Sequence, residues 1–126
     1  MVIAFANNQA MTAISGTPSV IYTDPVPLNG SDRATANFNV HYIWTTGTTT
    51  TIAYNAQVSS DGTNWVEVTA LTDSETAATQ LGTAIQLANK SVYGAFIRFY
   101  FTCTIAGSAG TLGGVAFDLH VLLDKS

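Results

Sequence analysis

The side chains best suited to hold a metal or act as a catalytic base are the two histidines, His41 and His120. Each occupies a polar position in a run of alternating apolar and polar residues, a pattern typical of a β-strand. Neither belongs to a His-x-His pair, the spacing that would place two ligands on one face of a strand. The pattern favours surface or half-buried histidines of a sheet, so we expect no metal ion and no cofactor.

Cys103 and the serines are the candidate nucleophiles. Cys103 alternates with Phe101 and Ile105, so it falls on an apolar strand face. A reactive thiolate needs an accessible, electropositive site, which favours a buried and inert thiol here. No Gly-x-Ser-x-Gly sequence singles out a serine. The glycine-rich segment 107–114 lacks a lysine and leads into a strand, so it predicts a hairpin loop and not a phosphate site. We expect no enzymatic activity.

Aromatic residues offer a different chemistry, because flat apolar rings stack on sugar faces. Three of them share the apolar alternation of strands, which favours packing in the core: Tyr42, Trp44 and Tyr54. Trp65 lies near two polar residues, Asp61 and Asn64, whose side chains can bond hydroxyl groups. These three residues are the candidate glycan contacts if the chain is a carbohydrate-binding module.

A third set of residues indicates contacts between chains. Phe96 and Tyr100 share a strand face with Arg98, opposite the apolar face of the same strand. The apolar residues Val2, Ile3 and Phe5 lie in a segment without a hairpin partner, and residues 1–10 form a candidate N-terminal arm. Unpaired apolar segments often become ordered against a partner. Packing onto the same domain is an equally weighted alternative for both groups.

The elements that position these residues are β-strands. Strict alternation predicts four long strands, at 36–44, 52–58, 95–105 and 115–123. Two shorter strands are predicted at 19–22 and 65–68, and a strand with weaker alternation is predicted at 81–87. Asp61-Gly62 predicts a tight hairpin turn, because glycine accepts a positive φ. The segment 45–50 predicts a turn that joins its neighbours as an antiparallel hairpin, and 73–79 predicts a loop or a short helical turn.

Each long strand has one apolar face that a second sheet would bury. The core faces comprise Ala36, Phe38, Val40, Tyr42 and Trp44; Ile52, Tyr54, Ala56 and Val58; Ala95, Ile97, Phe99, Phe101, Cys103 and Ile105; and Val115, Phe117, Leu119, Val121 and Leu123. We therefore predict an all-β fold, a single antiparallel β-sandwich of about seven or eight strands spanning residues 1–126. Its topology is of the jelly-roll or the immunoglobulin-like type.

Charge is scarce in this chain. Charged residues make up 10% of it, and its 19 threonines outnumber the 4 cationic and 8 acidic residues together. Four scattered cations cannot form the basic patch that nucleic acid or an anionic membrane would need: Arg33, Lys90, Arg98 and Lys125. The start of the chain has no basic region and only a short apolar run, so we expect no signal peptide and synthesis in the host cytoplasm.

Two segments resemble small β-sandwich proteins of tailed-bacteriophage virions. One is Ser59-x-Asp61-Gly62-x-x-Trp65, and the other is Tyr93-Gly94-Ala95-Phe96-Ile97-Arg98-Phe99, followed by a glycine-rich turn and an apolar strand ending in Asp124-Lys125. The resemblance covers about the C-terminal half of the chain. It implies a structural role in a virion, at the head or the tail, and no active site.

The leading hypothesis is a non-enzymatic capsid decoration protein that binds the particle surface as an oligomer. Its partners would be further copies of itself and other virion proteins, such as a major capsid protein. A charge-poor surface allows identical copies to pack closely with little repulsion. The main alternative is a carbohydrate-binding module for a glycan or host surface. An enzyme, or the major capsid protein of a small virus, has less support.

Overall fold

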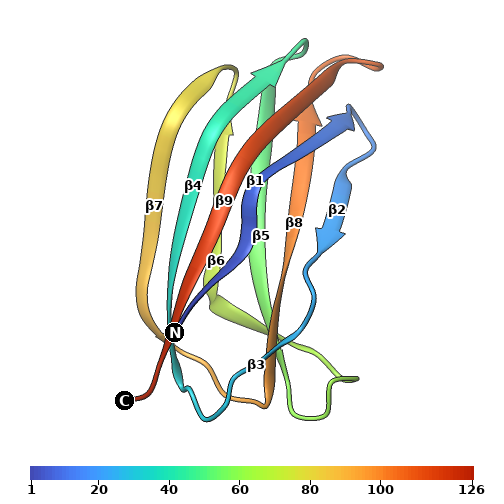
Figure 1. Cartoon of the computed structure of the whole chain (residues 1–126). Helices are drawn as coiled ribbons and strands as arrows, with labels where there is room; N and C mark the ends of the chain where they lie inside the picture. Colours follow the sequence, from blue (N-terminus) through green and yellow to red (C-terminus); the bar gives the residue numbers. More distant parts are fainter.

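Two antiparallel β-sheets stack face to face in the computed structural model, which describes the backbone of residues 1–126 and all side chains except those of Gln80 and Leu81. The first sheet (Figure 1) consists of β1 (Val2–Ile14), β9 (Leu112–Asp124), β4 (Arg33–Thr45) and β7 (Gln80–Ser91), in that order. The second has the order β2 (Ser19–Tyr22), β8 (Phe96–Ala106), β5 (Thr49–Ser59) and β6 (Val66–Ala77). The short β3 (Val26–Pro27) also pairs with β8. The predicted antiparallel β-sandwich is confirmed.

The strand order decides between the two predicted topologies. Because β2 and β3 both pair with β8, they act as two pieces of one edge strand. The chain then passes back and forth between the sheets, and β5 and β6 are the consecutive strands that pair with each other. This order, with first and last strands adjacent in one sheet, is that of a jelly roll.

Two predicted hairpins are wrong for this reason. The strands β4 and β5 lie in opposite sheets, and so do β8 and β9. The segment 45–50 and the segment 107–114 therefore cross between sheets. They lie against each other, since the backbone N–H of Thr46 donates to the carbonyl oxygen of Leu112 at 2.8 Å. Alternation shows which face of a strand is buried, but a strand buries that face equally well in either sheet.

The hairpin predicted at Asp61-Gly62 is confirmed. It joins β5 to β6, with Val58 opposite Val66 in an antiparallel pair. Gly62 has a φ of +78°, the left-handed conformation in which a Cβ is strained. The turn is thus specified by residues that are adjacent in sequence.

A β-bulge in β4 changes which aromatic residues reach the core. Val40 pairs with Phe117, but Tyr42 pairs with Ala116, so His41 is an extra residue on its strand. The extra residue reverses the alternation. The prediction of Tyr42 and Trp44 on the core face is therefore wrong. Ile43 is buried instead, Tyr42 is 42% exposed, and Trp44 is half-buried.

The prediction of a loop or a short helical turn at 73–79 is also wrong. Residues Asp73–Ala77 continue β6, and Thr50 to Asn55 of β5 pair with Ala77 to Thr72. The hydroxyls of Thr51 and Thr76 are 2.7 Å apart across this pair. Sequence analysis missed this part of the strand because β6 is an edge strand with polar residues on both of its faces, so it has little apolar alternation. The weaker strand predicted at 81–87 lies within β7.

The core lies between the sheets and is rich in aromatic rings. Phe38 lies with its ring centroid 4.9 Å from that of Tyr54, and Phe101 lies 4.8 Å from Phe117. The apolar faces predicted for β8 and β9 are confirmed from Ile97 to Ile105 and from Val115 to Leu123, whereas Ala95 is exposed. Cys103 is fully buried as predicted, and burial raises its pKa to about 11.

Candidate interaction surfaces

The candidate N-terminal arm lies in β1, one of the two edge strands of the first sheet. It pairs with β9 from Val2 opposite Leu122 to Ile14 opposite Leu112. Ile3 and Phe5 pack against the core, and the rings of Phe5 and Phe99 are 4.6 Å apart. Val2 is 66% exposed. Within one chain this segment completes the sandwich, and contact with a second chain stays a prediction.

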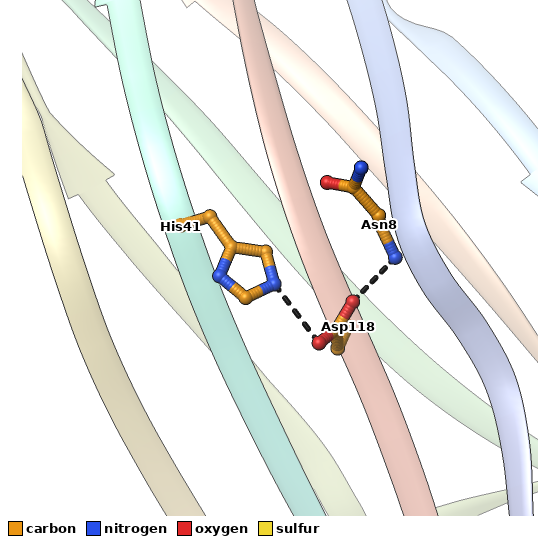
Figure 2. A network of polar contacts seen from close by, with 3 residues as sticks. All are labelled: Asn8, His41 and Asp118. Atoms are coloured by element: carbon orange, nitrogen blue, oxygen red, sulfur yellow. Dashed lines mark hydrogen bonds and ion pairs between the residues drawn. The ribbon is translucent and has the colours of Figure 1, made fainter.

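A polar network crosses three strands on the outer face of the first sheet. Figure 2 shows Asn8 of β1, His41 of β4 and Asp118 of β9 together. The Nε2 atom of His41 lies 2.9 Å from Oδ2 of Asp118, and the backbone N–H of Asn8 donates to Oδ1 of the same carboxylate. Asn8 has a φ of +49° at an irregularity in β1, which lets its N–H face Asp118. We call these three residues the Asp118 network.

The electrostatics of the Asp118 network indicate a structural role. Burial by itself would raise the pKa of Asp118, but hydrogen bonds from Asn8 and His41 outweigh it and hold that pKa below its usual value of 3.8. His120 adds a smaller favourable charge interaction. Among the described side chains, no three of His, Cys, Asp and Glu lie close enough to hold a metal ion. The network ties the edge strand β1 to the centre of the sheet.

The outer face of the second sheet carries an arginine surrounded by aromatic rings. The guanidinium carbon of Arg98 lies over the ring of Trp65, 4.2 Å from its centroid, and over the ring of Tyr22, 4.9 Å from its centroid. Tyr22 also lies 5.1 Å from the ring of Tyr100. We call these four residues the aromatic–arginine cluster. Tyr22 is 55% exposed, and Trp65, Arg98 and Tyr100 are half-buried.

Polar side chains hold this cluster in place. The Nε of Arg98 donates to Oε1 of Gln57 at 2.9 Å, and the amide of Gln57 donates to Oε1 of Glu67 at 3.1 Å. The hydroxyl of Tyr100 donates to the same Glu67 oxygen at 2.8 Å. Partial burial and this bond to Glu67 raise the pKa of Tyr100 to about 12. The cluster is therefore fixed by bonds across β8, β5 and β6.

Two of the candidate glycan contacts, Asp61 and Asn64, are used to build the turn. Oδ1 of Asp61 accepts from the backbone N–H groups of Thr63 and Asn64 at 2.9 and 2.8 Å, and Oδ2 accepts from the Asn64 amide at 2.8 Å. These bonds hold the pKa of Asp61 far below its usual range. The turn thereby places the next residue, Trp65, over Arg98.

The structure brings together members of both candidate sets. Tyr100 belongs to the candidate interface residues and Trp65 to the candidate glycan contacts. Both lie on the same surface, because Arg98 contacts the ring of Trp65 and shares a face of β8 with Tyr100. Phe96 is partly covered by the turn, since a Cβ at Gly62 would be 3.7 Å from its ring. Sequence reasoning missed Tyr22 as a site residue. The strand 19–22 was predicted, but nothing in the sequence indicates that it pairs with β8.

Comparison with known proteins gives a fold and no family. No family model and no curated protein matches the sequence. One solved chain, from "Structure of infectious bursal disease virus Gt strain", superposes on 96% of this chain with a TM-score of 0.59 and 12% identity. Another, from the Gx strain of the same virus, superposes on 98% with a TM-score of 0.51 and 10% identity.

The likeness concerns the β-sandwich alone. This chain spans 30% of the length of the Gt-strain chain and 31% of the Gx-strain chain. Both matched chains come from an animal virus, so they do not single out the tailed bacteriophages of the sequence resemblance. In the part of the chain that the structure describes, no helix has the length and apolar character needed to cross a membrane.

Proposed function

We propose that this chain is a non-enzymatic structural component of a virion. The observation that carries the proposal is the jelly-roll fold of this chain, on nearly the whole length of which chains from two virus structures superpose. The sequence resemblance to virion β-sandwiches supports the same role. The scarcity of charged residues adds physical support, because neutral surfaces pack closely without like-charge repulsion.

Within that role, we propose a capsid decoration protein that binds the particle as an oligomer. Its partners are other copies of the chain and a major capsid protein. Exposed apolar residues supply the contact surface, with Val2 of β1 as the most exposed of the candidate interface residues. Each square ångström of apolar surface buried contributes about 25 cal/mol, and many copies acting together make small contacts sufficient.

Oligomer formation is the direct test. Size-exclusion chromatography with light scattering should give a mass that is a multiple of the monomer. Val2→Ser should weaken the association, whereas Val20→Ser, a similar change at another exposed strand position, should not. Deleting residues 1–8 should weaken it further if the shortened chain keeps its fold. A strictly monomeric chain at high concentration would contradict the proposed oligomer. Unchanged association in both Val2→Ser and the deletion of residues 1–8 would contradict the role of the N-terminal arm in that oligomer.

Carbohydrate recognition is a second candidate function, favoured by the aromatic–arginine cluster. Tyr22 and Trp65 present rings at the outer face of the second sheet, as sugar-binding platforms require. If the cluster is such a platform, Trp65→Ala should abolish glycan binding while the fold is retained. Binding that survives this change would place the sugar elsewhere.

A further inference from the structure

We propose that the aromatic–arginine cluster binds saccharides that carry a carboxylate, such as sialic or uronic acids. This inference rests on the carbohydrate candidate and names its ligand class. Arg98 is the group that would distinguish acidic from neutral sugars, through hydrogen bonds from its terminal nitrogens to the ligand carboxylate. Tyr22 and Trp65 would contact the sugar ring.

The state of Arg98 is the first argument. Among the described residues, its Nε bonds Gln57, whereas Nη1 and Nη2 have no protein acceptor. No oxygen of a described Asp or Glu lies within 4.0 Å of the guanidinium. A guanidinium fork matches a carboxylate in geometry, and charge-assisted pairs are about twice as strong as neutral hydrogen bonds. Arg98 is thus oriented by the chain and left with donors for an external anion.

The surroundings of Arg98 favour a sugar over other anions. The ring of Tyr22, which is 55% exposed, offers apolar contact for the C–H face of a pyranose, and the half-buried Trp65 ring is stacked on Arg98. Glu67 lies on the same surface, fixed by Gln57 and Tyr100, and offers acceptor oxygens to hydroxyl groups. Its negative charge, in a chain of net charge -4, opposes polyanions such as nucleic acid. A ligand with one carboxylate on an otherwise neutral, hydroxylated ring fits Arg98, the aromatic rings and Glu67 together.

The experiment is a calorimetric titration of the full chain with 3′-sialyllactose, galacturonic acid, the methyl ester of galacturonic acid and lactose. We expect an acidic sugar to bind at least about tenfold more tightly than lactose, because a charge-assisted bidentate pair is lost with the carboxylate. Arg98→Gln should lower acidic-sugar affinity to the level of lactose. Thr104→Ala, on the same face of β8 but outside the cluster, should leave every affinity unchanged.

The outcomes separate this inference from the carbohydrate function. Equal binding of acidic and neutral sugars would overturn the role of Arg98 and leave carbohydrate binding standing. No binding of any of the sugars at millimolar concentration would overturn both. A glutamate-rich peptide that binds while the acidic sugars do not would replace the sugar with a protein ligand. If Arg98→Gln fails to fold, the methyl ester still decides, since it removes the charge from the ligand and leaves the chain intact.

Discussion

The two outer faces of the sandwich carry different chemistry, although the same alternation of residues builds both. On the first sheet, the carboxylate of Asp118 is bonded by His41 and by the backbone of Asn8. On the second sheet, Arg98 keeps two terminal nitrogens without a partner among the described residues. A charge satisfied inside the chain stabilises the fold, whereas an unpaired donor beside exposed rings is available to a ligand. The first face is therefore structural, and the second is the one proposed for binding.

A substitution in the core, which both sheets share, should destabilise both faces together by lowering the free energy of unfolding. Phe99 is fully buried, and its ring lies 4.6 Å from Phe5 and 6.1 Å from Tyr54. Phe99→Ala should lower the free energy of unfolding by about 3–5 kcal/mol, because it leaves a cavity between the sheets. Urea denaturation measures this loss, with the exposed Thr104→Ala as the control. A loss below about 1 kcal/mol would contradict the tightly packed core.

Removing the Asp118 charge should affect stability and not ligand binding. Asp118→Asn should cost about 1–2 kcal/mol at neutral pH, because hydrogen bonds to a charged group are weakened. The pKa of Asp118 is lowered by folding, so its stabilisation is present above about pH 4 and is lost as pH falls through the lower, folded-state value. The difference between wild type and variant should therefore be large at pH 7 and small at low pH.

Urea denaturation at several pH values measures this dependence. The matched control is Asp24→Asn, which changes an exposed carboxylate outside the network. A stability difference for Asp118→Asn that is unchanged between pH 7 and pH 2 would contradict the role of its charge. Weakened sugar binding by this variant would contradict the division between the faces.

The aromatic–arginine cluster should show the opposite behaviour. Its residues are partly exposed, and a cation–π contact at such a site contributes about 0.5–1 kcal/mol. Arg98→Gln should therefore change the free energy of unfolding by no more than about 1 kcal/mol. Thermal and urea unfolding measure this change. A loss comparable to that of Phe99→Ala would make the cluster part of the core stability and weaken its interpretation as a binding surface.

The smallest effect on stability is expected in the core between the two sheets, at Tyr54. Its hydroxyl is buried and has no hydrogen-bond partner in the described structure, and burial raises its pKa well above the usual value. An unpartnered buried hydroxyl costs free energy, so Tyr54→Phe should leave stability unchanged or raise it by up to about 1 kcal/mol. Denaturation that shows a clear loss would mean that the hydroxyl has a bound partner, such as a water molecule.

The sequence was most informative where the decisive residues are close together in the chain. The apolar faces of β8 and β9 follow from uninterrupted alternation, and the β5–β6 hairpin follows from Asp61-Gly62. The bulge at His41 has no local signal, since it becomes visible only when Val40 and Tyr42 are paired with β9. The face of Tyr42 was mispredicted for that reason.

The candidate site was predictable only in fragments. Arg98 and Tyr100 are two residues apart on one strand, so their shared face could be predicted. Tyr22 and Trp65 reach Arg98 through pairing of β2 with β8 and through the turn before β6. Strand neighbours depend on the packing of the whole domain, which alternation does not encode. Asp61 and Asn64, two of the candidate glycan contacts, bond each other within the turn, and the sequence did not indicate this because a turn and a binding loop use the same residue types.

The adjacency of β1 and β9 has a consequence for how the chain folds. Val2 pairs with Leu122, so β1 cannot pair along its edge until β9, the most distant strand of the sandwich in sequence, has been synthesised. The β5–β6 hairpin is available as an early local structure, while the other pairings close long loops. Folds dominated by such distant pairings typically fold in milliseconds to seconds, far more slowly than helical bundles. The sandwich should therefore complete its fold only after β9 has been synthesised, and loss of β9 would separate β1 from β4 in the first sheet.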